Sequence, residues 1–139
     1  MADTAWAMSQ ENVAIVRSHI EAYRRHDASV ALSLMDPHAV LDMNRIDGSD
    51  AIHGRHAIEE AANRYVGTFE DWTYEVERLT DLGSGTILAV VNETGRGKGS
   101  GAPVNRSFAT LYTLIDGMIV RITTFHTEQE AIEAAGLSE

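Results

Sequence analysis

The stretch Asp36-Pro-His-Ala-Val-Leu-Asp-Met-Asn44 marks the point where helical sequence gives way to strand sequence. Pro37 cannot continue the helix before it, and the residues after it fit a short strand. Side chains two positions apart in a strand share a face, so Asp42 points the same way as Val40. Two interpretations are open: an inward Asp42 that carries chemistry, or a strand end that turns into the polar loop 45–50.

The size and composition of the chain indicate one globular domain. Its 139 residues suffice for a single hydrophobic core, and 44% hydrophobic with 23% charged residues is an ordinary globular composition. We expect residues 1–8 to form a loose leader and residues 9–139 to form the domain. No apolar run is long enough to cross a bilayer and no secretory signal opens the chain, so we expect a cytoplasmic protein.

Charge and residue usage exclude several classes of function. Eleven Lys and Arg against 21 Asp and Glu give a net charge of −10 at pH 7, which disfavours nucleic acid and membrane surfaces as partners. The chain has no cysteine, hence no disulfide and no thiolate nucleophile. His53 and His56 have no third ligand nearby, so we expect no metal, and no cofactor-binding motif is present. The expected partner is a small apolar or cyclic ligand.

The first half of the chain shows helical periodicity. Apolar residues of the first helix fall on one stripe, and His19 lies inside this apolar arc between Ile15 and Tyr23, so we expect it to face inward. An inward histidine is either a hydrogen-bonded core residue or a catalyst, and both readings stay open. The predicted helices span residues 10–26, 28–35, 54–69 and 128–135.

From Asp71 the hydrophobic period changes to two, which indicates strands separated by glycine-containing turns. Helices followed by consecutive strands predict an α+β domain. In this fold class a curved antiparallel, or mixed, sheet wraps around helices in a cone-shaped barrel with an internal pocket. The predicted strands are 73–80, 86–95, 104–115 and 118–127, in addition to the short strand that carries Asp42.

Polar residues at inward strand positions are the candidates for a site, because burying one unpaired costs about 1–3 kcal/mol. If Ile122 points into the cone, Thr124 and His126 line its wall. On the preceding strand one face presents Arg106, Thr110 and Tyr112 to the same space.

Three further residues have two readings each. Tyr65 and Trp72 supply flat apolar walls for a ligand or pack in the core. Glu93 is either a cavity carboxylate or an ion-pair partner of Arg106 or Arg121, and we favour the ion pair.

The order of these elements resembles the nuclear transport factor 2-like superfamily, in particular its SnoaL-like polyketide cyclase and ketosteroid isomerase-like branch. The similarity covers nearly the whole chain after residue 8 and is specific for the fold rather than for one reaction. The phrases that carry it are Met8-Ser-Gln-Glu-Asn-Val13, Met35-Asp-Pro-His38, Glu93-Thr-Gly-Arg-Gly-Lys-Gly-Ser-Gly101, Asp116-Gly-Met-Ile-Val-Arg121 and Glu130-Ala-Ile-Glu-Ala-Ala-Gly-Leu137.

The resemblance implies site residues and partners. It puts Asp42 at the position of the base that ketosteroid isomerases use, while the oxyanion-stabilising positions fall on His19 and Thr110. Thr124 occupies the position of the catalytic aspartate of SnoaL-like cyclases, and His126 is one inward step further. The resemblance also implies a homodimer.

Two functions follow as expectations. In the first, a cofactor-independent enzyme acts on a cyclic or polyketide-like carbonyl compound: Asp42 abstracts a proton and His19 or His126 stabilises the enolate. Asn44, Tyr65, Trp72, Arg106, Thr110, Tyr112 and Thr124 then contact the substrate. In the second, the chain is a non-catalytic ligand-binding or dimerisation module in which His19 and Asp42 form a satisfied core pair.

Overall fold

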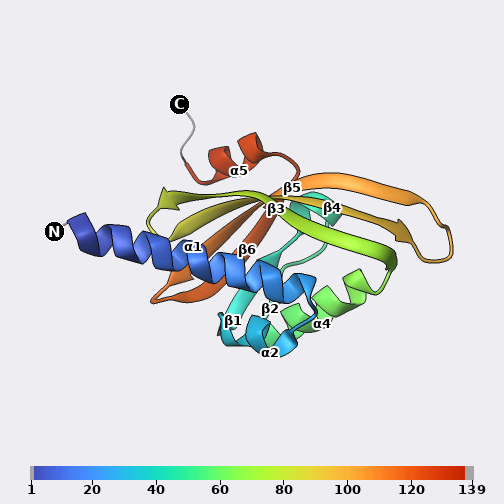
Figure 1. Ribbon diagram of the computed structural model, residues 1–139, viewed down its shortest axis with the longest axis horizontal. Coiled ribbons are helices and arrows are strands. Elements are labelled where there is room, and N and C mark those ends of the chain that lie inside the picture. Colours follow the sequence, from blue (N-terminus) through green and yellow to red (C-terminus); the bar gives the residue numbers. More distant parts are fainter. Residues whose placement is uncertain (1, 137–139) are drawn as a thin grey trace.

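A curved, unclosed sheet of six strands forms the centre of the protein in the computed structural model, which describes residues 2–136 (Figure 1). The strand order is β2-β1-β6-β5-β4-β3, with β1 parallel to β6 and every other pair antiparallel. The predicted α+β class with a mixed sheet is confirmed. The strands are β1 (Met35–Asp42), β2 (Ile52–His53), β3 (Phe69–Gly83), β4 (Thr86–Gly97), β5 (Pro103–Ile115) and β6 (Met118–Phe125).

Helices cover both faces of the sheet. The long first helix crosses one face, which we call the inner face, and the terminal helix lies on the opposite, outer face (Figure 1). None of the described helices is both long and apolar enough to span a membrane. The helices are α1 (Ala2–Arg24), α2 (Ala28–Ser33), α3 (Asn44–Asp47), α4 (Arg55–Val66) and α5 (Glu128–Ala134).

The N-terminal boundary differs from the sequence prediction. Helix α1 begins at Ala2, within the stretch predicted to be a loose leader, of which Met1 lies outside the described residues. Ser9, the expected cap, sits inside the helix, and its hydroxyl bonds the Asp81 carboxylate. The second helix does begin as predicted, because the Asp27 side chain accepts a hydrogen bond from the Val30 amide.

The main core lies between α1 and the inner face. Val16 and Ile20 of α1 are fully buried there against apolar residues of the strands. The residues of this cluster that come from β4, β5 and β6 include Ile87, Ala89, Val91, Phe108, Tyr112, Leu114, Ile119 and Ile122.

A smaller core lies on the outer face beneath α5. Ala131 of α5 packs on Leu88, Leu111 and Phe125. This short helix is held at its start by a capping box, in which the side chains of Thr127 and Glu130 bond each other's backbone amides.

The parallel pairing of β1 with β6 decides which way the β1 side chains point. Leu41 is opposite Ile122 on the inner face, and Asp42 is opposite Thr123 on the outer face. Ala39 is fully buried in the main core. The inward residues of β1 are therefore Ala39 and Leu41, so the predicted inward orientation of Asp42 is wrong.

The hairpin between β3 and β4 makes a close contact with β5. Gly85 has φ +78° and accepts a hydrogen bond from the Leu114 amide at 2.8 Å. A Cβ atom at Gly85 would lie only 2.5 Å from the Leu114 carbonyl oxygen, whereas one at Gly83 (φ +91°) would meet no atom within 4 Å.

We predict that Gly85→Ala destabilises the protein more than Gly83→Ala. Both substitutions place a side chain at positive φ, which lowers the free energy of unfolding by about 1–2 kcal/mol. Only Gly85→Ala also brings a Cβ atom against the backbone, which lowers it by a further amount of about 1–3 kcal/mol. Urea denaturation of both variants measures the difference in the free energy of unfolding. Equal losses would show that the close approach to Leu114 does not matter.

Candidate functional site

Four polar side chains, which we call the inner polar group, lie within the apolar core of the inner face. His19 comes from α1, Thr110 and Tyr112 from β5 and Thr124 from β6, and all four are buried. The Thr110 and Thr124 hydroxyls are 3.4 Å apart across the paired strands. The rings of His19 and Tyr112 meet edge to face, with centroids 5.8 Å apart. These four residues thus face inward, as predicted.

His19 has a nitrogen without a partner. The residue is 9% exposed, and its Nδ1 makes no hydrogen bond within the described part of the chain. Burial lowers the pKa of His19 from 6.5 to about 4, so the imidazole is neutral at neutral pH. A neutral imidazole presents one donor and one acceptor nitrogen. The protein thus leaves one hydrogen-bonding position of the buried His19 ring unfilled among the described residues.

A cluster of three aromatic side chains forms near the end of α1, one turn beyond His19. Tyr23 meets Trp72 and Tyr74 edge to face, at centroid distances of 5.1 and 5.0 Å, and Trp72 stacks on Tyr74. Burial raises the pKa of Tyr112 and of Tyr74 well above the usual range, so their hydroxyls stay protonated and available as donors. The inner face thus combines aromatic side chains with neutral hydrogen-bonding groups.

Glu93 is a fully buried carboxylate on the inner face. It accepts hydrogen bonds from the Tyr65 hydroxyl at 2.7 Å, Trp72 Nε1 at 2.9 Å and Arg106 Nε at 3.0 Å. Arg106 also donates to the Tyr65 hydroxyl. The prediction of an ion pair with Arg106 is confirmed. Tyr65, Trp72 and Arg106, predicted to contact substrate, are thus partners of Glu93.

Asp42 lies on the outer face, with α1 on the far side of the sheet from it. Its Oδ2 pairs with Nη2 of Arg121 at 3.0 Å, and its Oδ1 accepts a hydrogen bond from the Asn44 amide at 3.0 Å. Its side chain is 15% exposed. The sheet therefore separates Asp42 from His19, and the expected core pair of these two residues does not form.

Two other predicted residues also lie away from the inner polar group. Asn44 is exposed at the start of α3 and donates its side-chain amide to the Ser49 carbonyl at 3.0 Å. His126 is exposed just beyond the end of β6. The expected convergence of Asp42, His19 and His126 in one cavity is thus absent from the described structure.

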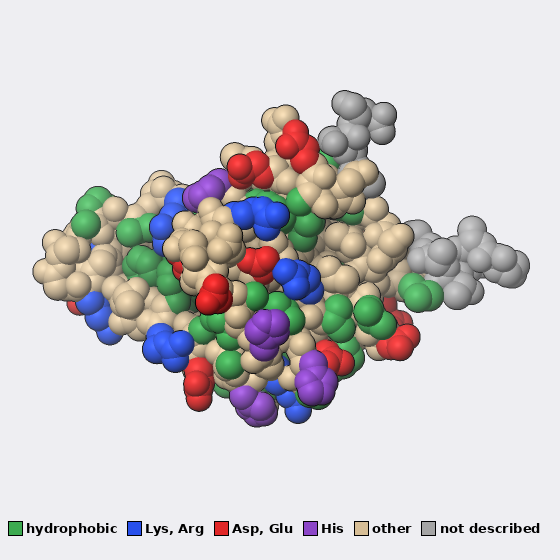
Figure 2. Space-filling view, turned by 180° about the vertical axis from the view of Figure 1, so that it is seen from behind, with side chains coloured by type: hydrophobic (Ala, Val, Ile, Leu, Met, Phe, Trp, Pro, Cys, Tyr) green, Lys and Arg blue, Asp and Glu red, His purple; other side chains and the backbone are tan. Residues whose placement is uncertain are grey.

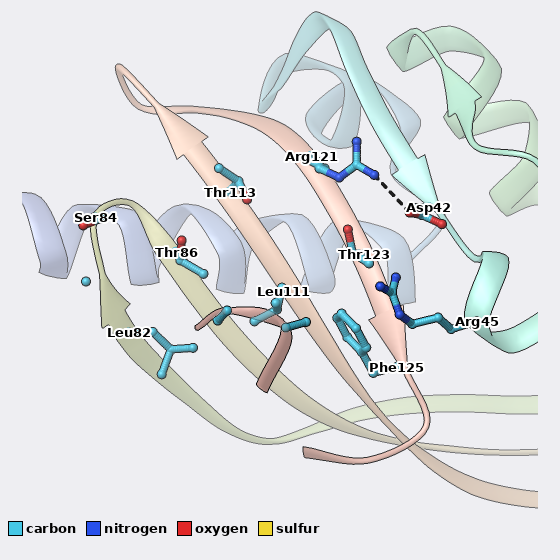
Figure 3. Close-up of a pocket in the computed structure, with 13 residues that line it drawn as sticks. Asp42, Arg45, Leu82, Ser84, Thr86, Leu111, Thr113, Arg121, Thr123 and Phe125 are labelled. Atoms are coloured by element: carbon cyan, nitrogen blue, oxygen red, sulfur yellow. Dashed lines mark hydrogen bonds and ion pairs between the residues drawn. The ribbon is translucent and has the colours of Figure 1, made fainter. Parts of the chain in front are cut away.

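A pocket of about 420 Å³ opens on the outer face, and we call it the outer pocket (Figure 3). Figure 2 views this side of the molecule and shows acidic and basic side chains next to each other near its centre. The lining residues come from α3, α5, the β3–β4 hairpin and the ends of β1, β5 and β6. They include Asp42, Arg45, Leu82, Thr86, Leu111, Thr113, Arg121, Thr123 and Phe125.

The outer pocket was not predicted, although its pattern is in the sequence. Arg121, Thr123 and Phe125 alternate along β6 on the face opposite Ile122. Pairing with β1 then adds Asp42 to the same face. Assigning the face of β1 correctly would have brought these residues together.

The family of the chain follows from comparison with known proteins. Residues 16–122 match the SnoaL-like domain family. The chain belongs to that family. Among curated proteins, none matches it significantly.

Solved structures share the SnoaL-like fold at low sequence identity. A candidate SnoaL-like polyketide cyclase from Jannaschia sp. CCS1 has a TM-score of 0.75 and 20% identity, with 94% of each chain covered. A hypothetical protein with a ketosteroid isomerase-like fold from Catenulispora acidiphila, in complex with trimethylamine, has a TM-score of 0.70 and 16% identity over 89% of this chain and 93% of that one. An LEH-like epoxide hydrolase of M. tuberculosis has a TM-score of 0.69 and 13% identity, over 89% and 88%.

We predict that Glu93→Gln destabilises the fold strongly. The amide removes the charge opposite Arg106 and turns one N–H group toward the converging donors, which costs about 2–4 kcal/mol. The exposed Glu75 of β3 is a matched control, and Glu75→Gln changes stability by less than about 0.5 kcal/mol. Urea denaturation at neutral pH measures both. A Glu93→Gln variant as stable as the control would rule out a structural role for the network.

We predict that His19 makes the protein less stable in acid. The unfolded chain protonates this histidine below about pH 6.5 and the folded chain only below about 4, so stability is lost as the pH falls between these values. The free energy of unfolding lost over this whole pH range is about 3 kcal/mol. Denaturation from neutral pH to about pH 4 should show a shallower loss in His19→Gln than in the parent or in His38→Gln, which alters an exposed histidine. Parallel curves would contradict the assignment.

Proposed function

We propose that this SnoaL-like domain binds a small, largely apolar carbonyl compound on its inner face and catalyses proton transfer on it without a cofactor. The observation that carries the proposal is the open Nδ1 of His19, buried beside Tyr112. A buried polar atom without a partner is unfavourable by about 1–3 kcal/mol, so a ligand that supplies the partner gains binding energy. The aromatic side chains Tyr23, Trp72 and Tyr74 favour a cyclic or polyketide-like ligand.

In the proposed reaction His19 acts on the carbon next to the ligand carbonyl. Its neutral imidazole accepts the proton from that carbon through the acceptor nitrogen. The protonated hydroxyl of Tyr112 donates a hydrogen bond to the developing enolate oxygen, with the Thr110 and Thr124 hydroxyls as further donors. Return of the proton to another carbon of the ligand completes an isomerisation, whereas return to the same carbon only exchanges its hydrogen. In a cyclisation the enolate carbon instead attacks a second carbonyl of the ligand, and the proton goes to the oxygen of that carbonyl.

This proposal moves the base from Asp42 to His19. The Asp42 carboxylate is paired with Arg121 on the far side of the sheet from Tyr112. A base must reach the proton it abstracts within hydrogen-bond distance, directly or through one water. For a ligand on the inner face, His19 lies on the same side of the sheet as Tyr112, whereas Asp42 lies on the opposite side.

A second candidate is a binding module of the same fold that performs no reaction. The low pKa of His19, about 4, favours it, because an imidazole of that basicity accepts a proton from carbon less readily than an ordinary histidine. In this case His19 and Tyr112 only orient the carbonyl by hydrogen bonds.

Deuterium exchange of β-tetralone in deuterium oxide, followed by NMR, tests the proposal. We predict that the protein accelerates exchange next to the carbonyl by about 100-fold or more over buffer, and that His19→Gln removes the acceleration while the exposed-site control His38→Gln keeps it. The reaction leaves the ligand otherwise intact, so proton abstraction is measured alone.

Two results would overturn the catalytic proposal. If β-tetralone shifts the protein's NMR signals without accelerated exchange, the binding module is correct. If Asp42→Asn abolishes exchange while His19→Gln retains it, the base is Asp42.

A further inference from the structure

The outer pocket concentrates positive charge on an acidic protein. The chain carries a net charge of −10, yet the charged residues that line the pocket in the described part of the chain are Arg45, Arg121 and Asp42. The local balance is therefore one excess positive charge. Within an otherwise repulsive surface, such a site attracts an anion.

Arg45 stacks on an aromatic ring in the outer pocket. Its guanidinium lies over the Phe125 ring, 4.7 Å from the centroid, and it forms no ion pair within the part of the chain that the structure describes. Stacking on an aromatic ring occupies the face of a guanidinium and leaves the N–H groups at its edge available. Arg45 can thus donate to a ligand in the pocket.

Arg121 is only partly engaged. The Asp42 contact uses one nitrogen, Nη2, of a group with five N–H donors. In Figure 3 the Thr123 hydroxyl points toward the space between the two guanidinium groups. Thr113, paired with Arg121 across β5 and β6, adds a second hydroxyl on the same face.

The remaining wall of the outer pocket is apolar. Leu82, Leu111 and Phe125 line it together with Ala134 of α5 and Ala135, which caps the C-terminus of that helix. With a volume of about 420 Å³ it falls in the range of small-molecule sites, roughly 300–1,000 Å³. One end of an occupant therefore meets cations and hydroxyls, and the other meets hydrocarbon.

We propose that the outer pocket binds a small amphipathic monocarboxylic acid. The carboxylate lies between Arg45 and Arg121, which match its planar two-oxygen geometry. Its hydrocarbon part packs on Leu111, Phe125 and Leu82. A monoanion balances the one excess charge, whereas a dianion such as phosphate leaves negative charge next to Asp42.

This second site is independent of the reaction proposed for the inner face. The sheet separates the outer pocket from His19 and Tyr112. The arginine variants that test the outer pocket differ from His19→Gln, which tests the inner face. Failure of one proposal therefore leaves the other standing.

Titration of the full chain with hexanoate, followed by backbone amide NMR signals and calorimetry, tests the proposal. We predict that hexanoate shifts the signals of Thr113, Thr123 and Phe125, and that Arg45→Gln and Arg121→Gln each weaken binding by about tenfold. Arg96→Gln, which alters an exposed arginine paired with Asp71, leaves binding unchanged. Asp42→Asn tightens hexanoate binding several-fold, because it removes the competing carboxylate and frees Arg121.

Four results would overturn the proposal. Binding of hexanoate that neither arginine variant weakens would place it elsewhere. Tighter binding of hexylammonium than of hexanoate would make Asp42 the dominant charge. Equal binding of inorganic phosphate would indicate an unselective anion site. Shifts of the same signals with protein concentration and none with hexanoate would show that a second copy of the chain covers the pocket. Thermal melting of each variant confirms that it is folded.

Discussion

The arrangement of both cores depends on the pairing of β1 with β6, because this pairing determines which β1 side chains face each core. Side chains alternate along a strand, so a shift of one residue would exchange the two faces completely. The observed register buries Ala39 and Leu41 with α1 and turns Asp42 toward Thr123. The pairing of β1 with β6 thus keeps the Asp42 carboxylate out of the main core and places it in the lining of the outer pocket.

The inner face buries one charged and one neutral side chain in different ways. Glu93 is enclosed between α4, β3, β4 and β5, where three donors replace water around its carboxylate. His19, in contrast, is buried as a neutral group with an open nitrogen. A satisfied carboxylate contributes to structure, while an unsatisfied neutral group suits reversible contact with a ligand.

Much of the fold could be predicted from sequence, and the site only in part. Long alternating strands and the stripe of α4 carry a strong periodic signal, and Glu93 beside Arg106 is the simplest way to bury a carboxylate. The run Ala39-Val-Leu41 is apolar at every position, so it does not reveal which face is buried. The inward interpretation of Asp42 depended on an inward Val40. The sequence does not reveal that α1 starts at Ala2, because Ser9 followed by an acidic residue has the pattern of a helix start. Pairing between β1 and β6, which are distant in sequence, leaves no local pattern.

Helix α5 links the outer core to the outer pocket. Its seven residues are too few to form a stable helix alone, so its structure depends on Ala131 against Leu88 and Phe125 and on the Thr127 capping box. Ala134 of the same helix and its C-cap residue Ala135 line the pocket. Undocking of this helix would dismantle the pocket and uncover the apolar patch in one step, at less free energy than unfolding the whole domain. Occupancy of the pocket and docking of the helix are therefore reciprocal: each raises the equilibrium constant of the other by the same factor.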